Sequence, residues 1–126
     1  MPTLTDYQTF QDTTRREALR FRFNLPSNFV EGTARAIPVL MFRVDAEDDC
    51  TCWVHVNDSA NNPTASNASI ELRVTGSSGH KTMHELLRGT GFRRGRENQI
   101  LIHKTPDATS GQFFVSDVVL MYQVEI

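Results

Sequence analysis

The sequence predicts a single antiparallel all-β domain, a jelly-roll β-sandwich with one short helical turn. Apolar and polar side chains alternate with a period of two in several short segments, as half-buried strands require. Turn-forming Gly, Pro, Asn, Asp and Ser residues separate these segments, which favours a sandwich or a barrel. The 126 residues suffice for one domain with its own core, so we expect no internal domain boundary.

The first half of the chain contains three predicted strands. Residues 1–17 are expected to form a peripheral N-terminal arm or an edge strand. Alternation over residues 19–25 predicts a strand that Pro26 ends, because proline cannot donate to a ladder. A nearly continuous apolar run over residues 37–44 predicts a central strand covered on both faces. Alternation returns over Cys50–Val56 and predicts the third strand.

The second half begins with a polar loop over residues 59–69, rich in Asn, Ser and Ala. Ile70–Val74 alternates and predicts a strand. Apolar residues at i, i+3 and i+4 predict one helical turn over residues 83–87. Further strands are expected over residues 99–103 and 112–124. The last segment is apolar on both faces, which again indicates a covered central strand.

Charge and hydropathy exclude several classes of protein. The formal net charge of −2 gives no positive surplus for phosphate, so we expect no nucleic-acid partner. No apolar run approaches the roughly 20 residues of a membrane span. The N-terminal segment lacks the basic and apolar regions of a signal peptide. We therefore expect a cytoplasmic protein or export by a non-classical route.

Cys50 and Cys52 are separated by one residue. On a strand they share a face about 6–7 Å apart, at or beyond the limit for a relaxed disulfide. We therefore expect two small buried apolar residues.

Three segments together resemble a known family pattern. They read FRVDAEDDCTCWVHVND from Phe42 to Asp58, HELLRGTGFRRGRENQILIH from His84 to His103, and SDVVLMYQVEI from Ser116 to Ile126. This order resembles galactose-binding-like jelly rolls, such as carbohydrate-binding modules and the sugar-binding domains of family 2 glycosidases. Asp58 stands where the pattern usually has glycine. The resemblance implies saccharide binding on loops or on a concave sheet face, and in many members a structural calcium.

Two groups of residues are candidates for ligand binding. Trp53 and His55 share a strand face with Thr51, where an exposed indole could stack on a sugar ring and a buried one would be core. Arginines beside a turn could bind a carboxylate, a sulfate or an acidic sugar, or simply be solvated. The candidate set is Trp53, His55, Asn57, Arg93, Arg94 and Arg96.

An acidic turn is a candidate metal site. Its carboxylates are Asp45, Glu47, Asp48 and Asp49, and such oxygen-rich clusters suit calcium. The EF-hand spacing is absent, so a solvated acidic turn is the alternative interpretation. We expect no other cofactor.

The sequence contains no motif of nucleophilic or paired-carboxylate catalysis that stands out from its background. We therefore expect a non-catalytic binding module, with carbohydrate as the expected ligand. The alternative is a structural or assembly protein, a subunit of a virus particle, a secretion apparatus or a surface layer, that forms a homo-oligomer through its jelly roll.

Overall fold

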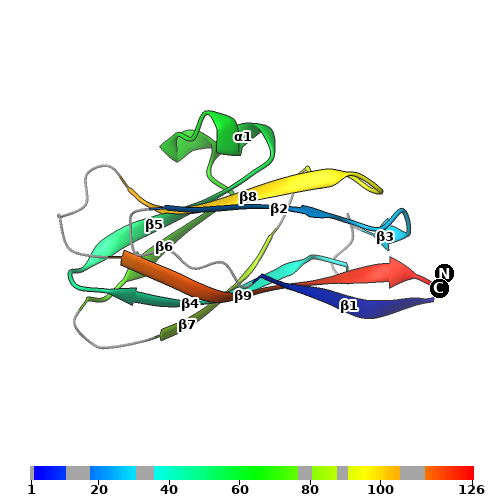
Figure 1. The fold of residues 1–126 in the computed structure, drawn as a ribbon, viewed down its shortest axis with the longest axis horizontal. Coiled ribbons are helices and arrows are strands. Elements are labelled where there is room, and N and C mark those ends of the chain that lie inside the picture. The colour runs from blue at the N-terminus through cyan, green and yellow to red at the C-terminus, as the bar shows by residue number, and fades with distance from the viewer. Residues whose placement is uncertain (1, 11–17, 31–35, 77–80, 88–90, 106–112) are drawn as a thin grey trace.

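A computed structural model of the chain shows two antiparallel β-sheets packed face to face (Figure 1). It describes residues 2–10, 18–30, 36–76, 81–87, 91–105 and 113–126. The five-stranded sheet has the order β1 (Thr3–Phe10), β9 (Phe113–Glu125), β4 (Val39–Ala46), β7 (Lys81–Leu86), with β3 (Phe29–Val30) also paired to β9. The four-stranded sheet has the order β2 (Ala18–Asn24), β8 (Glu97–Lys104), β5 (Cys50–Val56), β6 (Ile70–Val74).

The strand pairs are nested along the chain. β1 pairs with β9, β2 with β8, β4 with β7 and β5 with β6, and successive pairs alternate between the two sheets. This is the winding of a jelly roll, in which a long hairpin is folded over to form two sheets. The predicted fold class is confirmed by this topology.

One hydrophobic core fills the space between the sheets. β2 alternates strictly between exposed and buried residues, and β5 has the bounds that the sequence predicts. The largest fully buried side chains include Phe29, Phe42 and Phe113, which all come from the five-stranded sheet. The two sheets also meet through Phe10 of β1 and Phe21 of β2, whose ring centroids lie 4.4 Å apart.

The predicted helical turn over residues 83–87 is wrong. Residues Lys81–Leu86 form the edge strand β7, which pairs antiparallel with β4 over six positions. The inward positions of this segment are 83, 85 and 87, and the middle one is Glu85. With only Met83 and Leu87 apolar on that face, the alternation is too weak to recognise. Pairing with β4 therefore overrides the local helical spacing.

The helical turns lie instead in the predicted polar loop. They are α1 (Asp58–Asn61) and the 3₁₀ turn η1 (Ala65–Asn67). Figure 1 shows α1 over the outer face of the four-stranded sheet. No helix in the described part of the chain is long and apolar enough to cross a membrane.

β4 and β9 are central strands, as predicted, but only one face of each is covered. Their outward side chains, such as Met41 and Val119, remain partly exposed, and no described segment forms a third layer over them. β1 forms an edge of the five-stranded sheet, while residues 11–17 of the predicted arm lie outside the described residues.

Candidate functional site

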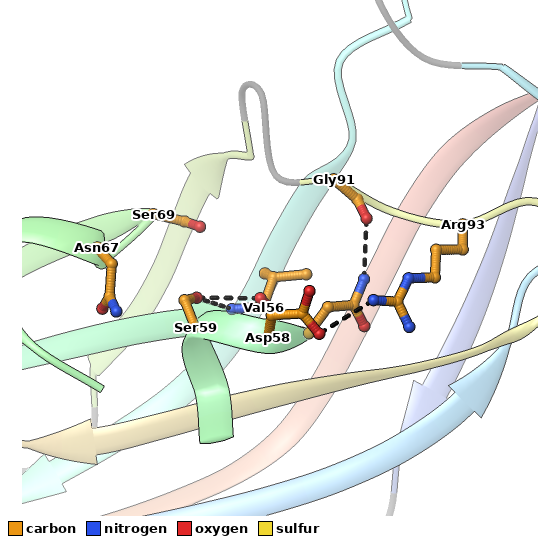
Figure 2. Close-up of a pocket in the computed structure, with 8 residues that line it drawn as sticks. Val56, Asp58, Ser59, Asn67, Ser69, Gly91 and Arg93 are labelled. Carbon is orange, nitrogen blue, oxygen red and sulfur yellow. Dashed lines mark hydrogen bonds and ion pairs between the residues drawn. The ribbon is translucent and has the colours of Figure 1, made fainter. Parts of the chain in front are cut away.

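A polar cleft of about 270 Å³ lies where β5 ends and α1 begins (Figure 2). It is lined by Val56, Asn57, Asp58, Ser59, Asn67, Ser69, Gly91 and Arg93. These residues come from the end of β5, from the segment with α1 and η1, and from the turn before β8. Backbone and side-chain hydrogen bonds hold the three segments together.

Asn57 is the residue at which the chain leaves β5. Its φ of 55° and ψ of −121° lie outside the helical and extended regions, at a backbone conformation that favours glycine. Its N–H donates to the Gln99 carbonyl at 2.9 Å, and its Oδ1 accepts from the Gln99 N–H at 3.0 Å. Its Nδ2 donates to the carbonyl of Gly91 and to Oδ1 of Asn98, each at 3.0 Å. Asn57 thus joins β5, β8 and the turn between residues 91 and 96.

Asn98 completes this network from the β8 side and is 1% exposed. Its Oδ1 accepts from the Arg93 N–H at 2.8 Å, and its Nδ2 donates to the carbonyls of Arg93 and Arg96. Because a buried amide costs free energy unless its atoms are bonded, the pair of amides fixes the turn in one conformation. Gly95, with φ of 61°, provides the left-handed residue of that turn.

The charged rim of the cleft is an ion pair. Nη2 of Arg93 lies 3.1 Å from Oδ1 of Asp58, and the two side chains are 45% and 90% exposed. Such an exposed pair adds little stability, typically about 0–1 kcal/mol. Its donors and acceptors remain accessible to solvent beside Ser59, whose hydroxyl is bonded to the backbone of Val56 (Figure 2). The rim can therefore offer hydrogen bonds of both kinds to a polar ligand.

A separate aromatic cluster occupies the outer face of the four-stranded sheet. Trp53 is partly exposed, its Nε1 donates to Glu71 at 2.8 Å, and its ring meets those of His55 and His103 edge to face. His55 is fully buried, and its Nε2 lies 2.9 Å from the Thr64 carbonyl. Because a carbonyl can only accept, Nε2 of His55 carries a proton. In the neutral form of His55, Nδ1 then has no proton and accepts a hydrogen bond from Nε2 of His103 at 3.1 Å.

Burial lowers the pKa of His103, and the proximity of His55 lowers it further. The lowered pKa favours the neutral form of His103, and the cluster forms a hydrogen-bonded support under the loop that bears Thr64.

The structure brings together only part of the predicted ligand-binding set. Asn57 and Arg93 line the cleft, and Trp53 and His55 form the aromatic cluster. Arg94 and Arg96 are exposed and do not line the cleft. Binding by each of these six residues stays a prediction.

Several lining residues were not singled out from the sequence: Asp58, Ser59, Asn67 and Ser69. For Ser59, Asn67 and Ser69 the one signal was the length and polarity of the loop over residues 59–69, because long loops in compact domains are often functional. Asp58 stood out only where the family pattern usually has glycine. Nothing in the sequence indicated that Asn98 bonds to Asn57 or that His103 bonds to His55. Each bond joins residues that are more than 40 positions apart in the chain.

The acidic turn between β4 and β5 is bonded to the segment that follows β6. Asp49 Oδ1 accepts the Gly76 N–H at 2.8 Å, which ties the turn to the end of β6. Within the described residues, no three His, Cys, Asp or Glu side chains are grouped as a metal site would need. Calcium binding by Asp45, Glu47, Asp48 and Asp49 stays a prediction.

The two cysteines are free and buried, as predicted. Burial raises the pKa of Cys52 to about 12 and raises that of Cys50 as well. A raised pKa lowers the fraction of thiolate, which is the nucleophilic form.

No family model matches the chain, and no curated protein is significantly similar to it. A carbohydrate-binding module, TmCBM61, solved with β-1,4-galactotriose, is 13% identical with a TM-score of 0.48, covering 99% of this chain and 89% of its own. The insecticidal δ-endotoxin Cry8Ea1 of Bacillus thuringiensis is 11% identical with a TM-score of 0.46, covering 95% and 20%. A family two carbohydrate esterase from Cellvibrio japonicus is 10% identical with a TM-score of 0.40, covering 98% and 35%.

The chain thus spans a fifth and about a third of the length of the last two proteins. With TM-scores below 0.5, these likenesses carry no argument about function. The fold assignment rests on the nested strand pairs themselves.

Proposed function

We propose that this chain is a non-catalytic saccharide-binding module and that the polar cleft is its ligand site. The observation that carries the proposal is a cleft whose wall is made of amide, hydroxyl, carboxylate and guanidinium groups on a turn fixed by buried hydrogen bonds. Sugar hydroxyls both donate and accept, so they match a rim that offers both. A prearranged rim also reduces the entropy that binding costs.

The cleft suits one neutral sugar ring. Its volume of about 270 Å³ lies near the lower end of small-molecule pockets, which begin at roughly 300 Å³. The charges of Arg93 and Asp58 cancel within the rim, so neighbouring hydroxyls of a neutral sugar fit it better than a lone carboxylate or sulfate. Phe92 packs edge to face on Phe23 and Phe29, and no aromatic residue is among the described residues that line the cleft. Recognition would therefore depend on hydrogen bonds and not on stacking of a sugar ring.

The same wall favours binding over hydrolysis. Among the described residues that line the cleft, Asp58 is the one carboxylate. Glycoside hydrolysis usually needs a second carboxyl group about 5–10 Å away. None of the other described lining residues is such a partner for Asp58.

The test is a calorimetric titration with neutral monosaccharides and disaccharides, and with a uronic acid as a charged comparison. We expect a neutral sugar to bind and Arg93→Ala to weaken it about tenfold or more, because a hydrogen bond to a charged group is lost. Arg22→Ala is the matched control. Arg22 forms a similar exposed ion pair with Glu97, with a nitrogen–oxygen distance of 3.6 Å, and neither residue lines the cleft. This control should bind normally.

Trp53→Phe separates the two candidate surfaces. Trp53 does not line the cleft, so this variant should bind as the wild type does. Loss of binding in Trp53→Phe but not in Arg93→Ala would move the site to the aromatic cluster. A protein that binds no sugar in the series would refute the proposal.

A further inference from the structure

In the described part of the chain, the strands at the ends of the two sheet orders (β1, β7, β2 and β6) are protected unequally. Charged side chains, above all basic ones, normally keep exposed edges from pairing with other chains. The edges carry Arg20 and Arg22 on β2, Glu71 and Arg73 on β6, and Lys81 and Glu85 on β7. β1 is eight residues long and contains neither Lys, Arg nor Pro, and its one charged residue is Asp6.

The hydrogen-bonding direction of β1 is fixed by two contacts. The Pro2 carbonyl accepts from the Ile126 N–H at the end of β9, so even-numbered residues face β9. The Tyr7 N–H instead bonds to the carboxylate of Asp6 at 2.8 Å. Odd-numbered residues therefore turn their N–H and C=O groups outward, and no described strand pairs with that side.

We propose that two copies of this chain pair antiparallel through β1, about a two-fold axis that places Tyr7 opposite Tyr7 of the second copy. The joined strands would continue both five-stranded sheets into one.

Symmetry restricts the register. A two-fold axis that makes neighbouring strands antiparallel must be perpendicular to the sheet, and it leaves each residue on its own face. The numbers of two opposed residues therefore have an even sum. Within Thr3–Phe10, sums of 12 and 14 give the greatest overlap, seven residues each (3–9 or 4–10).

Charge selects between these two registers. A sum of 12 sets Asp6 against Asp6 of the second copy, and directly opposed like charges are unfavourable. A sum of 14 sets Asp6 against Gln8, Thr5 against Thr9, and Tyr7 against itself on the axis. The Tyr7 N–H then donates to the second strand in place of the Asp6 carboxylate, and that carboxylate lies opposite the side-chain amide of Gln8 of the second copy.

The outer face supports the same register. Strand register places Tyr7, Met121, Val39 and Leu86 in one row across the sheet. Tyr7 and Leu86 are 64% and 46% exposed. Contiguous exposed apolar surface often marks an interface. Pairing at Tyr7 joins the two rows and covers their most exposed aromatic side chain.

The first experiment is sedimentation of the purified chain over a range of concentrations, where we expect a dimer. Thr5→Pro removes one outward N–H and keeps the backbone bonds to β9, so it should give a monomer. The one bond to β9 that it removes is the side-chain bond that Gln123 donates to Thr5 at 2.7 Å. Thr82→Pro is the matched control on β7. Leu87 donates to Pro38, so the outward groups of β7 are the even-numbered ones, including Thr82. This control should stay dimeric.

The second experiment tests the register by oxidation. Tyr7→Cys should form a covalent dimer, because opposed Cα atoms lie about 5.5 Å apart, within disulfide range. Thr5→Cys should not, since its two copies would lie about 14 Å apart along the strand. Cys50 and Cys52 are buried and should not compete. A chain that stays monomeric, or a dimer in which Tyr7→Cys does not cross-link, would overturn the proposal.

Discussion

At the scale of single residues, Asn57 and Asn98 determine the shape of the cleft. Their side-chain amides bond to each other at 3.0 Å and to backbone groups of the turn that carries Arg93. In the sequence, Asn57 directly follows one predicted strand and Asn98 directly precedes another. The sequence does not indicate that the two amides meet, because the residues are 41 positions apart and only the pairing of β5 with β8 brings them together.

His103 should make the stability of the protein depend on pH. Burial, His55 and Arg20 all lower its pKa below the usual 6.5. Between the lowered pKa and 6.5 the unfolded chain binds more protons, so the free energy of unfolding falls as the pH falls through that window. His103→Gln keeps a donor for His55 but does not titrate. It should lose less stability than the wild type in urea unfolding below pH 6.5, and equal losses would contradict this assignment.

At the scale of elements, the alternation of side chains predicts the strands that bury one face. β2, β5 and β6 are of this kind, and their bounds agree with the sequence to within about one residue. β7 escapes recognition because an edge strand with few core contacts needs few apolar residues. β4 and β9 contain more apolar residues than are needed to cover one face of a strand. The extra apolar side chains lie on the outer face of the sheet and include Val39 and Met121, which belong to the row that runs from Tyr7 to Leu86.

The candidate site is less predictable than the strands. Composition identifies the loop over residues 59–69 as unusual, but not that Asn67 and Ser69 face Arg93 across a cleft. That arrangement depends on η1, where Asn67 accepts from the Thr64 N–H at 2.9 Å and donates to Asn62. Such local hydrogen bonds compete closely with other turn conformations, and no period in the sequence reports which one wins.

Gly76 should be the most demanding glycine of the turns described. A Cβ there would lie within 2.6 Å of the Asp48 backbone nitrogen, so the acidic turn between β4 and β5 would have to move. Gly76→Ala should therefore cost about 1–3 kcal/mol in chemical unfolding. Gly91→Ala is the comparison, since its Cβ would meet nothing within 4 Å and only the φ of +73° is strained. If Gly91→Ala cost as much as Gly76→Ala, steric contact with Asp48 would not be the cause.

At the scale of the whole molecule, the jelly roll separates two surfaces. The cleft is lined by residues from the end of β5 and from the segment with α1, while β1 forms an edge of the other sheet. Figure 1 shows α1 beyond the four-stranded sheet and β1 in the five-stranded sheet. A two-fold axis perpendicular to the five-stranded sheet keeps both four-stranded sheets on one side of the joined sheet. The two clefts of a dimer would therefore lie on the same side of the joined sheet. Ligand binding and pairing can then be altered independently, because they share no residue.

This geometry predicts bivalent binding, provided that both the saccharide site and the β1 dimer are correct. The wild type should bind a surface densely coated with the sugar about 100-fold or more tightly than Thr5→Pro does, because the second cleft binds at a high effective concentration. Affinity for the free monovalent sugar should be the same in both proteins, since Thr5 lies outside the cleft. Surface plasmon resonance at several coating densities measures the first quantity and calorimetry the second. Equal retention of the two proteins on the dense surface would show that the clefts do not act together, and a loss of monovalent affinity in Thr5→Pro would show that β1 and the cleft are coupled through the fold.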